Sequence, residues 1–230
     1  MKALVLFSGG LDSSTALAMA VESYGKDNVI ALSISYGQKH IKEIESSKAV
    51  ANYYGVEHIY MDLSKVFEYS NCSLLEKNEF AKIPEGEYSD QLTKLHNNTL
   101  STYVPFRNGL FLSAAASIAI SKDCDIIYYG AHKDDAAGGA YPDCSEEFTK
   151  AMRDAIYLGS GKKVDLVGPF VGINKAGIVK IGLELNVPYH LTWSCYNGHD
   201  KACGKCGTCI DRIKAFEANG VKDPIEYEEN

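Results

Sequence analysis

The sequence predicts an α/β fold, a Rossmann-like doubly wound parallel sheet with helices on both faces and a C-terminal zinc-binding segment. Three observations support this prediction. Short apolar runs alternate with helical patterns, polar loops rich in glycine follow two of these runs, and four of the seven cysteines cluster near the C-terminus. Strands that alternate with helices are typical of parallel sheets, because parallel neighbours need crossover connections.

Composition narrows the class of protein. The 230 residues are 46% hydrophobic and 23% charged, which is ordinary for one folded main domain. A net charge of -7 disfavours a polyanionic partner, so we expect no nucleic acid to bind. The apolar run in MKALVLF is too short for a signal peptide or a membrane span, so we expect a cytoplasmic protein with no membrane partner.

The first quarter of the chain has a regular βαβαβ pattern. Gly25 and Gly55 end the two helical stretches, as glycine often does. The expected order is strand 2–7, helix 13–24, strand 29–34, helix 39–54 and strand 56–61.

The rest of the chain continues the alternation after an irregular insertion over 64–100, which could cover the site. Asn174 is a candidate N-cap, and Pro188 ends the helix that follows. The expected order is helix 107–121, strand 125–130, a glycine-rich polar loop over 131–143, a helix from 145, a strand-like run at 164–167, and helices over 174–185 and 210–218.

A phosphate-binding loop is predicted at Ser8–Ser13, which reads SGGLDS between the first strand and helix. The free amides and dipole at a helix N-terminus attract phosphate, and Gly9 and Gly10 let the backbone approach it. Asp12 would orient the loop or hold the Mg²⁺ that a nucleotide brings. A tight turn with an N-capping serine is the alternative. Neither GxxxxGK[ST] nor GxGxxG is present in the loop.

The cysteine cluster predicts a structural zinc site. Its four members follow a C-x7-C-x2-C-x2-C pattern and are Cys195, Cys203, Cys206 and Cys209. Four thiolates fill a tetrahedral zinc shell and leave no open position for catalysis. An iron–sulfur cluster, free thiols and a disulfide are the alternatives, and His199 is a possible substitute ligand.

The sequence resembles two nested families. SGGLDS in its strand-to-helix setting resembles the pyrophosphate loop of the N-type ATP pyrophosphatases, which adenylate their substrates. Further strings resemble the 7-cyano-7-deazaguanine synthases of queuosine biosynthesis. They are FSGGLDSSTAL at 7–17, YGQKHIKEIE at 36–45, VPFRN at 104–108, GAHKDDAAGGAYPDC at 130–144 and TWSCYNGHDKACGKCGTCIDR at 192–212.

The resemblance implies an ATP-dependent ligase that converts 7-carboxy-7-deazaguanine and ammonia into 7-cyano-7-deazaguanine through an adenylated carboxylate and an amide. It implies ATP with Mg²⁺, structural Zn²⁺ and a homodimer. It also implies an adenine-nucleotide alpha hydrolase-like domain over 1–190, with a zinc-binding segment and C-terminal helix over 191–230 packed on it. The nucleotide would contact Phe7, Ser8, Gly9, Gly10, Leu11, Asp12, Ser13, Ser14, Thr15, Ala16 and Leu17.

Charged residues in the matching strings are candidates for catalysis. Positive groups can stabilise charge on the transferring phosphates, and His40 and Glu43 share a helical face. The catalytic candidates are Asp12, Ser13, His40, Glu43, Arg107 and Lys175. For Arg107 and Lys175, and for the His40–Glu43 pair, solvated surface positions are the alternative.

The loop after the strand at 125–130 is the predicted deazapurine site. Carboxylates accept hydrogen bonds from a guanine-like edge, and an aromatic ring can stack on its face. The candidates are Phe106, Asp134, Asp135, Tyr141 and Asp143. The reading GGAYPDC departs from the more compact GYPDC of the family, which puts the geometry of this loop in question, and simple solvation of an acidic loop is the alternative.

Two other functions compete with this one. A tRNA-sulfurating or tRNA-modifying adenylase of the same superfamily would share the phosphate loop. A non-catalytic nucleotide- or zinc-binding module would share the motifs without turnover. The acidic charge disfavours the first. Release of pyrophosphate and AMP that depends on an added carboxylate substrate would exclude the second.

Overall fold

The computed structural model describes the chain except for residues 40, 79–80, 94–99, 137–139, 198–199 and 230. Its centre is a parallel sheet with strand order β3-β2-β1-β4-β5. The strands are β1 (Ala3–Leu6), β2 (Val29–Ser35), β3 (Glu57–Asp62), β4 (Ile126–Tyr129) and β5 (Asp165–Val167). The order reverses at β1, so the carboxyl ends of β1, β2 and β4 border one crevice, where ligands of such sheets bind.

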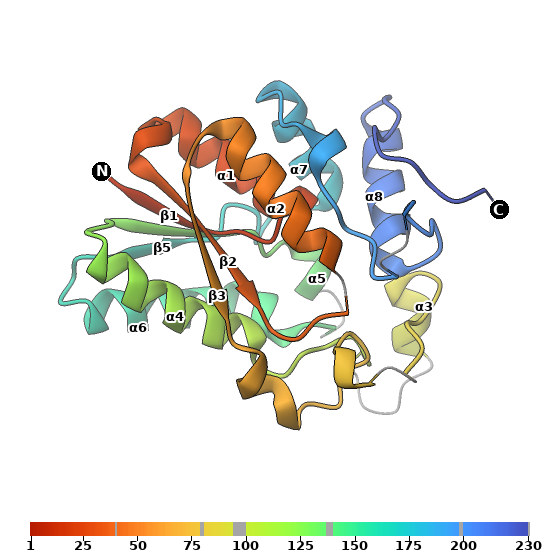
Figure 1. The fold of residues 1–230 in the computed structure, drawn as a ribbon, viewed down its shortest axis with the longest axis horizontal. Helices are drawn as coiled ribbons and strands as arrows, with labels where there is room; N and C mark the ends of the chain where they lie inside the picture. The colour runs from red at the N-terminus through yellow and green to blue at the C-terminus, as the bar shows by residue number, and fades with distance from the viewer. Residues whose placement is uncertain (40, 79–80, 94–99, 137–139, 198–199, 230) are drawn as a thin grey trace.

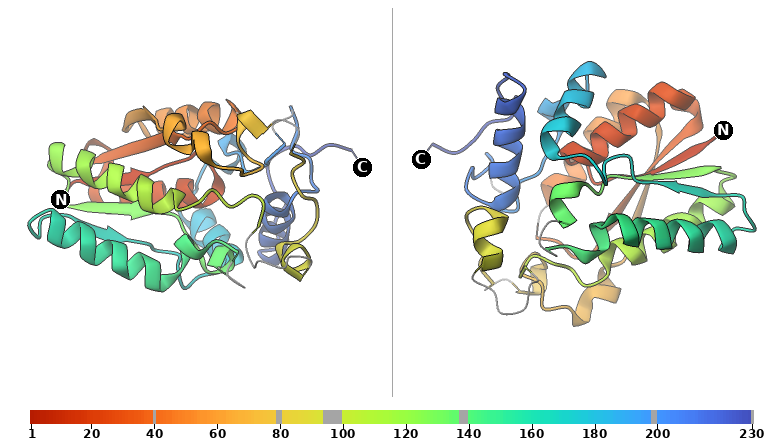
Figure 2. Two further views of the ribbon diagram at one scale, coloured as in Figure 1. Left: turned by 90° about the horizontal axis from the view of Figure 1, so that it is seen from below. Right: turned by 180° about the vertical axis from the view of Figure 1, so that it is seen from behind.

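Helices cover both faces of the sheet (Figures 1 and 2). One face packs against α1 (Leu11–Tyr24), α2 (Ile41–Tyr54) and α7 (Lys175–Glu184). The other packs against α4 (Arg107–Ser121) and α6 (Glu146–Gly159). Neighbouring residues of β1 point into different cores, Val5 toward the first set and Leu4 toward the second. The predicted doubly wound α/β fold is therefore confirmed.

Most helix boundaries lie close to those predicted from the sequence, but two helices start earlier. Helix α1 starts at Leu11, two residues earlier than expected, because Gly10 is its N-cap. Asn174 caps α7 as predicted, accepting a hydrogen bond from the Gly177 amide at 2.9 Å. Helix α8 (Gly207–Ala218) starts three residues early, because Cys206 takes the N-cap position.

The two segments expected to be irregular contain short helices. The insertion includes η2 (Ser64–Tyr69), η3 (Glu76–Asn78) and α3 (Tyr88–Thr93). The loop after β4 includes α5 (Lys133–Ala136) and η5 (Pro142–Cys144). Two further 3-10 turns are η1 (Lys26–Asn28) and η6 (Tyr189–Leu191). Elements this short have too few residues for a periodic apolar pattern, so the sequence did not reveal them.

The C-terminal part of the chain packs on the α7 side of the sheet. Helix α8 lies against α7, and the rings of Tyr189 and Phe216 meet edge to face at 5.2 Å. In the residues that the structure describes, none of the helices is both long and apolar enough to cross a membrane.

Candidate active site

A cavity of about 220 Å³ lies at the carboxyl ends of β1, β2 and β4. The loop Ser8–Ser13 lines it on one side. Helices α2 and α4, the loop after β4 and the segment before the cysteines supply the other walls. The cavity therefore lies at the point where the strand order of the sheet reverses.

The phosphate loop is held by its own backbone and two hydroxyls. The Ser8 amide donates to Ser13 Oγ at 3.2 Å, and the Gly10 amide donates to Ser8 Oγ at 3.2 Å. Gly9 has φ +83°, and a Cβ there would clash with the backbone of α2 at Ser47. Among the described residues no side chain caps α1, so its first amides are available to an anion.

Asp12 and Lys175 form a largely buried ion pair beside the loop, with Lys175 Nζ 3.2 Å from Asp12 Oδ2. Burial would raise the pKa of Asp12, but the charges of Lys175 and His132 outweigh it and hold that pKa below its usual value. Asp12 Oδ1 is buried without a hydrogen-bond partner in the described part of the chain. This oxygen is therefore free to take a ligand that the protein itself does not supply.

Glu43 of α2 and Arg107 of α4 also line this cavity. Burial raises the pKa of Glu43 to about 7, although the nearby charge of Arg107 opposes the shift. The Arg107 guanidinium lies 5.3 Å from the centre of the Tyr36 ring. Glu43 is therefore poised to exchange a proton near neutral pH.

A smaller cavity of about 50 Å³ adjoins the larger one, and both are lined by Arg107, Asp135, Cys144 and Tyr196. The other residues of its wall are Thr102, Tyr103, Val104, Tyr141 and Asp143. Burial raises the pKa of Tyr141 to about 12, so its phenol stays protonated and can donate. The Tyr141 hydroxyl also lies 2.7 Å from Thr102 Oγ1.

Asn108 joins α4 to the loop that carries Asp143. The Asn108 amide donates to Asp143 Oδ2 at 2.9 Å, and its side chain donates to Asp143 O at 3.1 Å and Cys144 Sγ at 3.2 Å. Burial raises the pKa of Asp143, although Asn108 and Arg107 oppose the shift. The first turn of α4 thus fixes this wall of the smaller cavity.

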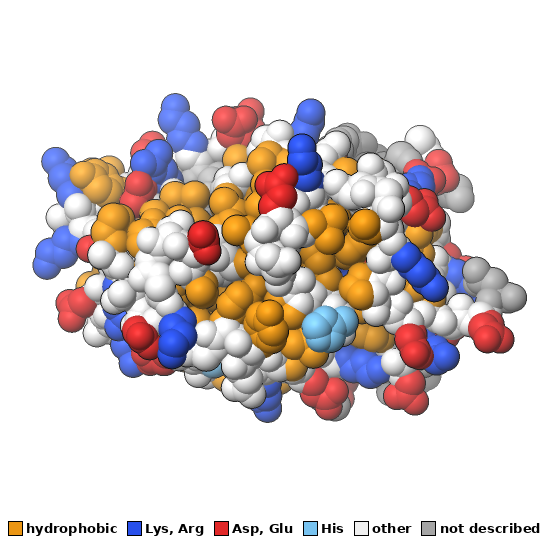
Figure 3. Space-filling view, turned by 90° about the horizontal axis from the view of Figure 1, so that it is seen from above, with side chains coloured by type: hydrophobic (Ala, Val, Ile, Leu, Met, Phe, Trp, Pro, Cys, Tyr) orange, Lys and Arg blue, Asp and Glu red, His pale blue; other side chains and the backbone are white. Residues whose placement is uncertain are grey.

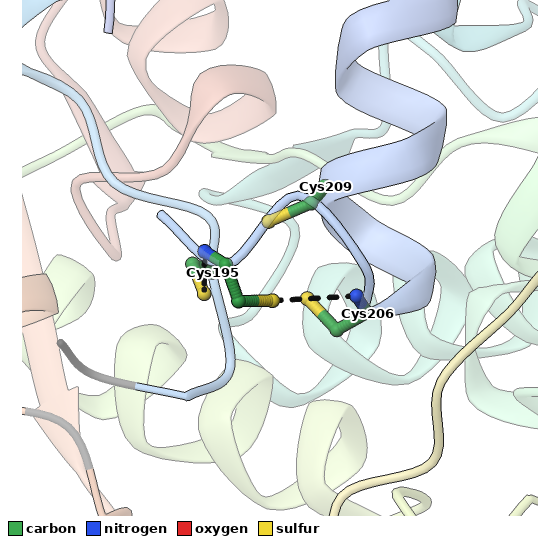
Figure 4. Close-up of side chains that lie close together, drawn as sticks. Cys195, Cys206 and Cys209 are labelled. Carbon is green, nitrogen blue, oxygen red and sulfur yellow. Dashed lines mark hydrogen bonds between the residues drawn. The ribbon is translucent and has the colours of Figure 1, made fainter. Parts of the chain in front are cut away.

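The four clustered cysteines are buried, and their sulfurs lie within 4.8 Å of one another. Figure 4 shows three of them, Cys195, Cys206 and Cys209, with their side chains close together. The Cys203 amide donates to Cys195 Sγ, and the Cys206 amide donates to Cys203 Sγ, both at 3.3 Å. Thiolates around one tetrahedral zinc stand about 3.8 Å apart when each bond is about 2.3 Å. A cubane cluster binds each thiolate to a different iron and spreads them farther. The four sulfurs therefore fit a single metal ion.

Arg212 fixes the segment that joins the cysteines to the phosphate loop. Its buried guanidinium makes a two-point ion pair with Asp223, at 2.7 and 3.0 Å, and donates to Thr192 Oγ1 at 2.8 Å. The Trp193 amide then donates to Gly9 O at 3.1 Å. The cysteine segment and the phosphate loop are thus in direct contact through their backbones.

Most of the predicted site residues come together at the two cavities. The larger cavity is lined by Phe7, Ser8, Gly10, Leu11, Asp12, Ser13, Glu43, Arg107, Asp135 and Lys175. The smaller cavity is lined by Arg107, Asp135, Tyr141 and Asp143. His40 and His199 lie outside the described residues.

Other predicted residues lie away from the cavities. Ser14, Thr15, Ala16 and Leu17 are buried within α1. Asp134 accepts a hydrogen bond from the Lys175 amide at 2.8 Å, so its carboxylate supports the start of α7. Phe106 is 58% exposed and packs edge to face on Phe148. Gly9 acts through its backbone, because its carbonyl holds Trp193.

Several residues of the site were missed by sequence reasoning. Asn108 lies in VPFRN, and Trp193 and Tyr196 lie in TWSCYN, so matched strings contained them. The matched strings were therefore the available signal, but only Phe106, Arg107 and Cys195 were singled out from these two stretches. Tyr36, which lines the larger cavity, and His132 were also missed. His132 is a buried residue of the loop after β4, and its Nε2 lies 3.8 Å from Asp12 Oδ2 and 3.3 Å from Asp135 Oδ2.

Comparison with known proteins identifies relatives over nearly the whole chain. The family model described as queuosine biosynthesis protein QueC matches residues 2–220. A protein of Caldicellulosiruptor saccharolyticus named 7-cyano-7-deazaguanine synthase is 46% identical over 99% of this chain and 96% of its own length. One of the same name from Pseudoalteromonas atlantica is 43% identical over 99% of both chains.

A solved structure shares the fold. The U34-tRNA thiolase NcsA from Methanococcus maripaludis, solved with its [4Fe-4S] cluster, superposes with a TM-score of 0.50 at 20% identity. The match covers 86% of this chain and 61% of that one. At this identity the likeness concerns the fold alone.

Proposed function

The chain belongs to the family of the queuosine biosynthesis protein QueC, whose relatives are 7-cyano-7-deazaguanine synthases, and we propose that its two adjoining cavities divide the reactants between them. As a member of this family, the protein is an ATP-consuming ligase of queuosine precursor biosynthesis. The larger cavity would take ATP, and the smaller cavity would take 7-carboxy-7-deazaguanine.

The phosphates of ATP would rest on the loop Ser8–Ser13. The free amides of α1 and the ammonium of Lys175 offer positive ends to pyrophosphate as it leaves. Asp12 would hold the Mg²⁺ that accompanies ATP, because its buried Oδ1 lacks a partner in the described part of the chain. The adenosine would extend toward Ser33 and Tyr36 at the end of β2.

The deazapurine would occupy the smaller cavity with its carboxyl group toward the larger one. Asp143 and Asp135 offer acceptors for the N–H groups of a guanine-like ring, and Tyr141 offers a flat face and a phenol donor. Arg107 lies where the cavities meet and would bind the substrate carboxylate or the transferred phosphate. The main support for this assignment is that the two cavities share part of their walls.

Two activations by ATP account for the product. The carboxylate oxygen first attacks the α-phosphate, releasing pyrophosphate, and ammonia then displaces AMP to give the amide. The amide oxygen attacks a second ATP in the same way, and loss of AMP and protons leaves the nitrile. Glu43, with its pKa of about 7, would accept a proton from ammonia or from the amide.

We propose zinc as the ion held by Cys195, Cys203, Cys206 and Cys209. Zinc supplies a closed tetrahedral centre that stabilises the fold and has no open position for substrate. Binding of metal to such a site is folding free energy. Chelation should therefore lower the melting temperature, and one zinc per chain by elemental analysis should restore it. Iron with acid-labile sulfide would contradict the assignment.

We further propose a homodimer through the face formed by α1, α2 and α7. Hydrophobic side chains gather in the middle of this face, with charged groups toward its margins (Figure 3). Among the large hydrophobic side chains of these helices, Tyr53 of α2 is 57% exposed and Leu183 of α7 is 38% exposed. Burial of such a patch is typical of permanent subunit contacts. Leu183→Asp should shift sedimentation from dimer to monomer, and a monomeric wild type would exclude this proposal.

A product assay tests the function. The protein is incubated with ATP, Mg²⁺ and ammonium, together with either 7-carboxy-7-deazaguanine or tRNA, and the products are analysed by mass spectrometry. We expect 7-cyano-7-deazaguanine, AMP and pyrophosphate, formed only when the carboxylate is present. Modified tRNA with no nitrile would support the tRNA-modifying alternative instead.

A further inference from the structure

The segment 81–93 of the insertion docks on the cysteine segment. The Gly86 amide donates to Lys205 O at 3.0 Å, and Glu85 forms an isolated β-bridge with Cys206. Lys214 of α8 lies 2.6 Å from Glu87. Helix α3 accordingly lies beside the start of α8 in Figure 1 and in the right panel of Figure 2.

Tyr88 is the residue of this segment that reaches from the cysteines toward the smaller cavity. Its ring lies so close to Gly207 that a Cβ at residue 207 would be 2.7 Å from Tyr88 Cε1. On its other side, the ring meets Tyr141 edge to face at 5.9 Å. The Tyr88 hydroxyl donates to the Tyr196 hydroxyl at 3.4 Å.

Tyr141 and Tyr196 both line the smaller cavity, and Tyr88 stands behind them. Burial keeps the pKa of the Tyr88 and Tyr141 phenols above the ordinary value, so both remain neutral donors. Neutral donors suit a flat heterocycle that carries a carboxylate, because they bind its oxygens without repelling its charge.

We propose that Tyr88 is a positioning residue for the deazapurine substrate, and that Gly207 in the metal-binding segment provides the space in which its ring lies. This inference rests on the proposed function. It assigns a role to the insertion, which would complete the substrate site by supporting Tyr141 and Tyr196. It also links the metal to substrate recognition, because the metal ligands Cys206 and Cys209 flank Gly207.

Substitutions at Tyr88 test the first part. Tyr88→Ala should raise the KM for 7-carboxy-7-deazaguanine about tenfold, with kcat and the KM for ATP changed by less than about threefold. Tyr88→Phe keeps the ring that touches Tyr141 and should restore most of the affinity. Tyr69→Ala is the matched control, because Tyr69 lies in the same insertion and is 92% exposed. Equal changes in both KM values, or none, would overturn the proposal.

Gly207→Ala tests the second part without touching Tyr88. Gly207 is the first residue of α8 and has no positive φ, so alanine suits the backbone and only its methyl group conflicts with Tyr88. The KM for the deazapurine should rise about fivefold, with the ratio of metal to protein unchanged. Gly159→Ala is the control, because a Cβ at Gly159 meets nothing within 4 Å. An unchanged KM in Gly207→Ala would refute this part.

The wild-type reaction separates the two proposals. If the wild type makes the nitrile and the variants behave like it, the role of Tyr88 fails while the proposed function stands. If the wild type makes no nitrile under any condition, the function fails and the role of Tyr88 fails with it. A metal content that falls in the Tyr88 variants would indicate a purely structural role and would also count against the inference.

Discussion

The phosphate loop and the smaller cavity border the same larger cavity but are built in different ways. The loop is one run of six residues, held by hydrogen bonds between Ser8, Gly10 and Ser13. The wall of the smaller cavity comes from three separated parts of the chain, represented by Thr102, Tyr141 and Tyr196. A local motif can specify the first region, whereas the second depends on the whole fold.

In the proposed function, this difference separates two tasks. The loop would bind the phosphates of ATP, which an adenylation needs whatever its substrate, at a helix N-terminus. The surrounding segments provide what differs between substrates, and these segments can vary without disturbing the loop. The loop is not fully independent of the rest of the chain, because the Trp193 amide of the cysteine segment donates to the Gly9 carbonyl.

The largest expected effect tests how far the loop depends on that distant support. Arg212→Met leaves Asp223 buried without its charge partner, and should lower the free energy of unfolding by about 3–5 kcal/mol. Urea denaturation measures this change. If folded Arg212→Met protein binds ATP like the wild type, the loop does not depend on Arg212. A lower ATP affinity under conditions in which the variant is fully folded would show that it does.

A matched pair on the surface is the control for Arg212. Arg153 makes the same two-point contact with Asp165, at 2.6 and 2.7 Å, but the two side chains are 55% and 35% exposed. Arg153→Met should therefore lower the free energy of unfolding far less than Arg212→Met does, because an exposed ion pair contributes little. Similar losses for both variants would mean that burial does not determine the value of these ion pairs.

The second-largest expected effect concerns Lys175, which lies beside the phosphate loop. Lys175→Met removes the ammonium beside Asp12 and should lower kcat about 10²- to 10³-fold, because positive charge is needed as pyrophosphate leaves. Pyrophosphate release measures the rate. Lys180→Met, on an exposed position of the same helix, should leave it unchanged. A Lys175→Met enzyme with normal kcat would remove Lys175 from the reaction.

The sequence predicted the two regions to different extents for the same physical reason. Strand, glycine turn and helix follow one another at the loop, so Ser8–Ser13 could be recognised without knowledge of the fold. Lys175 reaches Asp12 only because α7 packs beside α1, which no local pattern reveals. Asn108 was missed because a buried amide has value only through Asp143 and Cys144, which lie 35 and 36 residues away.

The smallest effect concerns Glu43, which faces the loop from α2 and whose backbone carbonyl lies beside Gly9. Its pKa is about 7 in the folded protein against 4.5 for the free group, so the folded state binds the extra proton between these values. Stability due to Glu43 is therefore present below pH 4.5 and is lost as the pH rises through 7.

Glu43→Gln removes this titration. The stability of the variant relative to the wild type should increase between pH 5 and pH 8, by an amount on the order of 1–3 kcal/mol. Urea denaturation at several pH values measures the difference, and Glu45→Gln, at an exposed position of the same helix, is the control. A difference that stays constant with pH would mean that Glu43 titrates like a solvated carboxylate. Glu43 would then lose its proposed role as the group that accepts a proton from ammonia or from the amide.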